Sequence, residues 1–141
     1  MYETLFQDIQ LFPGAKQLIY LLAKNKYKLA IATGGHTKEK VKEILNIFSL
    51  DTFFPVIVSS DEVAHGKPAP DIFLEAAKRL GIAPTYCLVL EDASIGVIAG
   101  NAAGMKVVAV PNIYTQQQNF SKADRIVTSL TEITLPLIKS L

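Results

Sequence analysis

Hydrophobic positions along the chain switch repeatedly between the spacing of a helix and that of a buried strand. Leu18, Leu21 and Leu22 recur at three- and four-residue intervals, which predicts a helix that begins near Pro13 and ends near Asn25. The segment 28–32, which is apolar from Leu29 onward, then predicts a short buried strand. A polar, glycine-containing loop and a second helical pattern follow, so this part of the chain is expected to fold as helix, strand, loop and helix.

The same alternation continues toward the carboxyl end. Gly81 and Gly104 follow two further helical patterns as natural left-handed stops, and Ser129 with Glu132 forms a capping-box signature for a final helix. Further strands are expected at 56–58, 86–90, 107–110 and, more weakly, 126–127. The strands are continuously apolar rather than alternating in polarity, and they are separated by helices. This pattern predicts an α/β fold with a parallel sheet covered by helices on both faces.

Composition narrows the function classes. The chain has 141 residues, with 14 Lys and Arg against 13 Asp and Glu, which is enough for one domain and carries no basic stripe. Nucleic-acid binding through phosphate contacts is therefore disfavoured, and no apolar run is long enough to span a membrane. The start of the chain lacks the pattern of a secretory signal, and the single Cys87 is expected in the core. These features indicate a cytoplasmic protein.

Polar residues follow the first expected strand. Thr33 provides a hydroxyl group, and Gly34 and Gly35 allow backbone N–H groups to approach an anion near a helix N-terminus. The alternative is an ordinary turn in which Thr33 or Thr37 caps the next helix.

Two adjacent carboxylates, Glu91 and Asp92, follow the expected strand 86–90. Like charges at the mouth of a buried strand need a compensating cation, and either Lys67 or a hard divalent ion such as Mg²⁺ suits this role. The alternative is a solvated acidic loop in which Asp92 caps the helix that begins near Ser94.

Lys67 stands between a glycine and two prolines in the segment 66–71. Such a loop suits a fixed point charge directed at a phosphate or a carboxylate, although an exposed lysine is the ordinary alternative. Ligands of open α/β sheets lie beyond the carboxyl ends of the strands, so the three polar segments together predict a site for phosphate and magnesium. His36 and Asp61 lie near the same side, and neither they nor His65 receive an assigned role.

Three segments, 30–35, 66–73 and 90–105, resemble motifs II, III and IV of the haloacid dehalogenase-like (HAD) superfamily. They are most similar to the subgroup of phosphatases and β-phosphoglucomutase-like enzymes. The resemblance extends over nearly the whole chain from about Leu11. It implies a Rossmann-like core, formed here by a single domain over residues 1–141.

The resemblance implies a phosphate-binding role for several of these residues. Thr33 would hydrogen-bond the transferring phosphoryl group, with the N–H groups of Gly34 and Gly35 beside it. Lys67 would neutralise the phosphoryl oxygens and the nucleophile.

The resemblance also implies that Asp92, together with Glu91, would hold Mg²⁺ directly or through water. Such groups would stabilise a reaction whose nucleophile in the family is an aspartate that forms an aspartyl-phosphate.

That aspartate belongs to an Asp-x-Asp motif, for which no match is identified. Asp8 is the only aspartate before Thr33, and Gln10 stands two residues after it, so we do not assign Asp8 as the nucleophile. Residues 11–14 resemble the return from the family's cap into the core. We therefore interpret residues 1–12 as a remnant of the connection between cap and core.

In the family, the first strand lies between the strands that here end at Thr33 and Leu90. Its absence would leave these neighbours about 9 to 10 Å apart, which is two ladder spacings. We expect either a fragment of a longer protein or a strand supplied by residues 2–6 or by another chain. Self-association is one route to the latter.

The sequence thus predicts a Mg²⁺-dependent phosphohydrolase, or with less support a phosphomutase, that lacks its nucleophile and is weak or inactive alone. Its expected substrate is a small phosphorylated metabolite, a class that includes the sugar phosphates, and the residues do not identify which one. The alternative is a non-catalytic phosphate- and metal-binding domain that regulates or scaffolds a partner. A receiver-like domain and a dehalogenase are both disfavoured.

Overall fold

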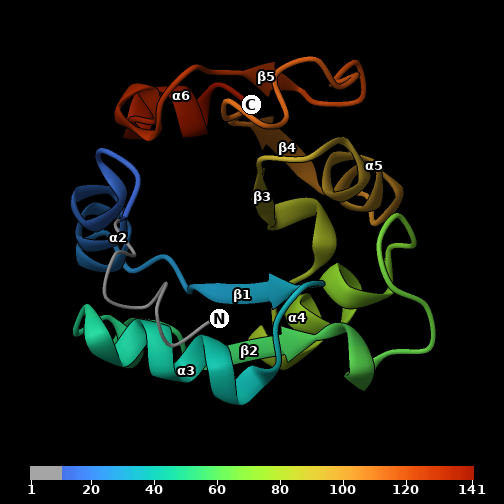
Figure 1. Cartoon of the computed structure of the whole chain (residues 1–141). Coiled ribbons are helices and arrows are strands. Elements are labelled where there is room, and N and C mark those ends of the chain that lie inside the picture. The colour runs from blue at the N-terminus through green and yellow to red at the C-terminus, as the bar shows by residue number, and fades with distance from the viewer. Residues whose placement is uncertain (1–10) are drawn as a thin grey trace.

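A computed structural model of the chain describes residues 11–141 (Figure 1). The interpretation of residues 1–12 and of Asp8 lies almost wholly outside the described residues. The helices are α2 (Ala15–Lys24), α3 (Lys38–Ile47), α4 (Asp71–Leu80), α5 (Ser94–Ala102) and α6 (Leu135–Lys139). The strands are β1 (Ala30–Thr33), β2 (Val56–Ser59), β3 (Leu88–Glu91), β4 (Lys106–Ala109) and β5 (Arg125–Ile126).

The strands form two parallel sheets. In one, β1 pairs with β2 from Ala30 opposite Val56 to Thr33 opposite Ser59. In the other, β3 pairs with β4, which in turn pairs with the short β5. Within residues 11–141, β1 and β3 share no ladder, in agreement with the interruption expected between them.

Helices cover both faces of these sheets, as the continuously apolar strands predicted. Side chains alternate along each strand, so Val58 and Val107 face α4 and α5, whereas Ile57 and Val108 lie on the opposite face. On that opposite face, α3 packs against β2, and α2 and α6 cover β3 and β4. The α/β fold with helices on both faces is therefore confirmed.

Helix α4 connects the two sheets through side-chain packing. It contacts β1 and β2 directly, and Phe73 and Ala77 belong to the same buried cluster as Val89 and Val107. A cavity of about 530 Å³, lined largely by apolar side chains, lies between β1 and β3. The two sheets thus share a hydrophobic core although the described residues supply no hydrogen-bonded strand between them.

One local prediction was wrong in its assignment. Ser129 and Glu132 do form a capping box, but it caps the N-terminus of the 3₁₀ turn Leu130–Glu132 rather than that of the final helix. Helix α6 begins later, where the Thr134 hydroxyl accepts a hydrogen bond from the Leu137 N–H at 3.2 Å. Pro136 in its first turn explains this start, because proline lacks an N–H that this turn would leave unpaired.

The longest helices of the described part have ten residues, and none is long and apolar enough to cross a bilayer.

Candidate functional site

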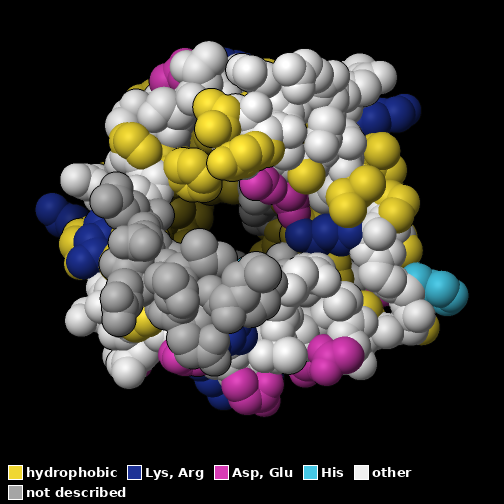
Figure 2. All heavy atoms as spheres, viewed as in Figure 1, with side chains coloured by type: hydrophobic (Ala, Val, Ile, Leu, Met, Phe, Trp, Pro, Cys, Tyr) yellow, Lys and Arg dark blue, Asp and Glu magenta, His cyan; other side chains and the backbone are white. Residues whose placement is uncertain are grey.

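The carboxyl ends of β1 and β3 open onto a cavity of about 1450 Å³. In the space-filling view, acidic and basic side chains lie together beside a central hollow, and hydrophobic side chains border it (Figure 2). The lining includes all six residues predicted from the sequence, namely Thr33, Gly34, Gly35, Lys67, Glu91 and Asp92. The structure therefore brings together three segments that are far apart along the chain.

The loop after β1 leaves its glycines open to the cavity. Thr37, not Thr33, caps α3, because its hydroxyl accepts a hydrogen bond from the Lys40 N–H at 3.2 Å. Thr33 ends β1, and its hydroxyl accepts a 3.3 Å hydrogen bond from the His36 N–H. A Cβ added at Gly34 or Gly35 would meet no atom within 4 Å. The backbone here is thus accessible to a ligand in the cavity.

Lys67 lies between the two sheets and is 11% exposed at its side chain. Its ammonium group donates to the carbonyl oxygen of Ala32 in β1 at 3.2 Å and forms an ion pair with the carboxylate of Glu91 in β3. The same group lies 5.0 Å from the centre of the Phe73 ring, which is a favourable cation–π position. The sequence-based expectation that Lys67 compensates the paired carboxylates is confirmed for Glu91.

Glu91 is held against the start of α5. Its side chain is 10% exposed, and a Cβ on Gly96 would come within 2.0 Å of its Cδ atom. A side chain at residue 96 would therefore displace the carboxylate, because real Cβ contacts are never this short. Glycine at residue 96 thus permits the close approach of the Glu91 carboxylate to α5.

Asp92 is exposed to the cavity, and the side-chain amide of Asn112 donates a hydrogen bond to its Oδ2 atom at 3.0 Å. The alternative in which Asp92 caps α5 is not observed. The N-cap residue of α5 is Ala93, whose methyl side chain forms no capping hydrogen bond. Instead, the side-chain carbonyl of Gln118 accepts a hydrogen bond from the Ser94 N–H at 2.8 Å.

The donor set fits a hard cation that retains water. Within the part of the chain that the structure describes, no group of three or more His, Cys, Asp or Glu side chains could enclose a metal ion. Glu91 and Asp92 offer two carboxylates, of which Glu91 also faces Lys67. Mg²⁺ commonly binds through one or two carboxylates, with waters and substrate phosphate oxygens completing its shell. These residues therefore suit Mg²⁺ better than an ion that needs a full protein cage.

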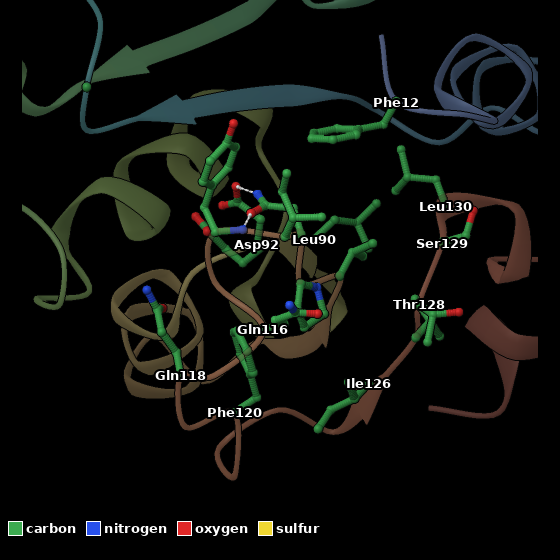
Figure 3. A pocket seen from close by; sticks show the side chains of 18 of the residues that line it. Phe12, Leu90, Asp92, Gln116, Gln118, Phe120, Ile126, Thr128, Ser129 and Leu130 are labelled. Atoms are coloured by element: carbon green, nitrogen blue, oxygen red, sulfur yellow. Dashed lines mark hydrogen bonds between the residues drawn. The ribbon is translucent and has the colours of Figure 1, made fainter.

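Several lining residues were not assigned from the sequence. Asn112, Gln116 and Gln118 come from the connector between β4 and β5. Phe12 and Leu130 lie across the cavity from Gln118 (Figure 3). The wall opposite these amide side chains therefore combines apolar side chains with the hydroxyl groups of Thr128 and Ser129 (Figure 3).

His36, Asp61 and His65, to which the sequence assigned no role, lie in different places in the structure. His36 lines the cavity. Asp61 accepts a hydrogen bond from the Ser59 hydroxyl, and His65 lies 3.4 Å from a carboxylate oxygen of Asp71. Neither Asp61 nor His65 is among the residues that line the cavity.

Comparison with known proteins gives a consistent result. The sequence profile of the family described as haloacid dehalogenase-like hydrolase matches residues 1–110. The chain is 42% identical over 135 residues to the bifunctional riboflavin kinase/FMN phosphatase of Arabidopsis thaliana, covering 96% of this chain and 36% of that protein. It is also 42% identical over 135 residues to a probable pseudouridine-5'-phosphatase of Drosophila melanogaster, covering 92% and 58%, respectively.

The crystal structure of CbbY from Rhodobacter sphaeroides in complex with phosphate superposes with a TM-score of 0.89 at 30% identity. That match covers 96% of this chain and 63% of CbbY. The chain thus spans between about a third and three fifths of the length of these relatives.

Proposed function

This chain belongs to the haloacid dehalogenase-like hydrolase family, and from that premise we propose that its site serves Mg²⁺-dependent hydrolysis of a phosphate monoester. The observation that carries the proposal is the arrangement around Lys67. One ammonium group joins the end of β1, which bears Thr33, to the end of β3, which bears Glu91 and Asp92. Phosphate-binding and cation-binding groups therefore border one cavity.

We assign the phosphoryl group to the end of β1. The Thr33 hydroxyl can donate to a phosphoryl oxygen while it accepts from the His36 N–H, since a hydroxyl has one donor and two acceptor sites. The open backbone at Gly34 and Gly35 supplies N–H donors beside it. Preorganised donors of this kind stabilise the charge that develops in phosphoryl transfer.

Lys67 supplies the fixed positive charge. Its ion pair with Glu91 and its bond to Ala32 hold the ammonium group in place before substrate binds. A positioned charge in a site of restricted solvent access costs little reorganisation when the reaction takes place. This is the function expected of a lysine that is only 11% exposed.

Asp92, with Glu91, would hold Mg²⁺ at the end of β3. When bound, the ion would supply electrostatic neutralisation of the phosphoryl oxygens. Asp92 is the better direct ligand of the two, because Glu91 already faces Lys67.

The family's aspartate nucleophile has no counterpart at this cavity within residues 11–141, where Glu91 and Asp92 are the only acidic residues in its lining. We propose that a segment outside these residues places that carboxylate between β1 and β3. Its oxygen would attack phosphorus and the ester alcohol would leave. Water would then hydrolyse the acyl phosphate, releasing inorganic phosphate and regenerating the carboxylate.

A non-catalytic phosphate- and metal-binding role is the second candidate, favoured by the same lack of a third carboxylate in the described lining. Under either role, the ligand is proposed to be a small phosphorylated metabolite, a class that includes the sugar phosphates. The names of the two relatives, an FMN phosphatase and a probable pseudouridine-5'-phosphatase, support this class.

Binding and turnover measurements on the full chain test the proposal. Calorimetry should detect binding of Mg²⁺ and of inorganic phosphate to the chain. Asp92→Asn should abolish Mg²⁺ binding, and Thr33→Val should weaken phosphate binding. Asp51→Asn, at an exposed position outside the cavity, is the matched control. Unchanged Mg²⁺ binding in Asp92→Asn would refute the cation site.

An aryl phosphate assay separates the two roles. Slow or absent turnover by the chain alone is expected, because the two carboxylates that line the cavity within residues 11–141 are assigned to the cation and no third one is present as a nucleophile. Robust turnover that is abolished by Asp92→Asn would show that the chain already contains its nucleophile and would exclude the non-catalytic role.

A further inference from the structure

The connector between β4 and β5 contacts the carboxylate-bearing loop at two points. The side-chain amide of Asn112 donates to Asp92 Oδ2 at 3.0 Å. The side-chain carbonyl of Gln118 accepts from the N–H of Ser94 at 2.8 Å. Figure 3 shows the labelled side chains of Asp92 and Gln118 on the side of the cavity away from Phe12 and Leu130. Two amide side chains thus hold the loop from one direction.

The orientation of the Asn112 amide is fixed by its other bonds. Its Oδ1 atom accepts a hydrogen bond from the N–H of Tyr114 at 2.8 Å, and the Thr115 hydroxyl lies 3.4 Å from the same oxygen. The Asn112 backbone N–H donates to that hydroxyl at 3.0 Å. An amide has a distinct acceptor and donor end, so these contacts to the oxygen direct the NH₂ group toward Asp92.

Strand register brings the two residues together. Glu91 pairs with Ala109 across the β3–β4 ladder, and the N–H of Val110 donates to the Glu91 carbonyl at 2.7 Å. The chain then leaves β4 at the same edge at which it leaves β3. Asn112 and Asp92 therefore meet although twenty residues separate them.

We propose that Asn112 is a positioning residue for the cation site, an inference that rests on the proposed function of Asp92. By occupying Oδ2, the amide orients the carboxylate and leaves Oδ1 to ligate Mg²⁺. A carboxylate that is already ordered loses less rotational freedom when the ion binds. Outer hydrogen bonds of this kind are commonly worth about 10- to 100-fold in metal affinity.

The competing explanation is that Asn112 only forms a turn. The bond from Tyr114 N–H to its side chain is an Asx turn, and a serine hydroxyl can accept the same bond. Asn112→Ser therefore retains a turn acceptor, but its shorter side chain does not reach Asp92. Asn112→Ala loses both the turn acceptor and the donor.

The matched control is Asn119→Ala. Asn119 lies in the same connector and accepts a 2.9 Å bond from the Ser121 N–H, but it does not line the cavity. The Asn119→Ala variant therefore removes the same kind of side-chain acceptor from a local turn, but it removes no contact of Asp92.

The experiment is calorimetric titration of each full-length variant with Mg²⁺, with the melting temperature recorded as a check of folding. We expect the dissociation constant to rise about tenfold or more in both Asn112 variants and to stay unchanged in Asn119→Ala. An affinity lost only in Asn112→Ala would overturn the proposal in favour of the turn, and so would unchanged affinity in both. If Asn112→Ala does not fold, Asn112→Ser alone decides between these results.

Asp92→Asn separates this inference from the proposed function. If that variant loses Mg²⁺ binding and the Asn112 variants retain it, only the positioning role is wrong. If the unaltered chain and Asp92→Asn bind Mg²⁺ equally well, the cation site itself is wrong.

Discussion

The ammonium group of Lys67 and the carboxylate of Glu91 form an ion pair at the point where two separate sheets approach each other. Lys67 precedes α4 in the chain, whereas Glu91 is the last residue of β3. Both side chains are about nine-tenths buried, and the lysine also bonds to the Ala32 carbonyl of β1. The pair therefore takes part in holding the two sheets together as well as forming the site.

Lys67→Met is expected to destabilise the fold, because it leaves the Glu91 carboxylate buried without its partner. Removing one member of a buried ion pair typically costs about 3–5 kcal/mol. Urea denaturation gives the free energy of unfolding. The double variant Lys67→Met with Glu91→Gln should recover a large part of the loss, since no unpaired charge is then buried. A single variant within about 0.5 kcal/mol of the parent would contradict a structural role for the pair.

Gly96→Ala should lower stability, although alanine normally favours a helix by about 1 kcal/mol over glycine. The added methyl group would overlap the Glu91 carboxylate, and overpacking of this kind typically costs about 1–3 kcal/mol. Gly66→Ala is a suitable control, because a Cβ there meets only the Ser60 Cβ at an ordinary 3.8 Å. Thermal unfolding of both variants checks the sign, and a stabilised Gly96→Ala would show that Glu91 moves away without cost.

Acid unfolding should depend on Glu62. The backbone N–H of Ser59, and after it the Arg79 guanidinium, lower the pKa of Glu62 to about 2 from a usual value of 4.5. A lowered pKa in the folded state means that this carboxylate contributes its full stabilisation above about pH 4.5 and loses it as the pH falls toward 2. Glu62→Gln should therefore reduce the slope of unfolding free energy against pH in that interval.

Arg79→Met provides the graded comparison for Glu62. It should reduce the same slope by less than Glu62→Gln, because the Ser59 N–H, the larger cause, is retained. Equal effects of the two variants would indicate that the guanidinium rather than the backbone bond controls this pKa.

Cys87 should react slowly with thiol reagents in the folded protein. Burial raises the pKa of its thiol, and the Sγ atom lies 3.5 Å from the Ala83 carbonyl oxygen. Because the thiolate is the reactive form, labelling at pH 8 should be at least about tenfold slower in the native protein than in urea. Equal rates in the two states would show that the fold does not protect this partly buried thiol.

Local signals in the sequence were sufficient for most elements. Gly81 and Gly104 have φ values of 73° and 77°, as expected for left-handed residues that end helices. The Thr37 cap was one of the two alternatives open, and its side chain reaches a backbone N–H only three residues away. Features that depend on neighbouring residues alone were therefore predictable. The capping box at Ser129 shows the limit, because the same local bonds fit either a single turn or a helix.

Long-range contacts could be predicted only where charge required them. Lys67 and Glu91 were expected to meet because two carboxylates need a cation, and the structure joins them across 24 positions. Asn112 and Gln118 carry no charge, and their bonds to the loop at 92–94 span 20 and 24 positions. Their residue types are equally suited to any polar loop. Only the register of β3 against β4, which local residue patterns do not reveal, places them beside the loop that carries Asp92.

The division of the described strands into two sheets affects how precisely the site can be held. Thr33 belongs to one sheet and Asp92 follows the other, with no ladder between β1 and β3 in the part of the chain described. Among the described residues, the ends of β1 and β3 are held at their distance by side-chain packing on α4 and by the Lys67 contacts, and such contacts are more compliant than a hydrogen-bonded ladder. A small rotation of one sheet about α4 would therefore change the separation between Thr33 and Asp92, the residues proposed to hold the phosphate and the cation.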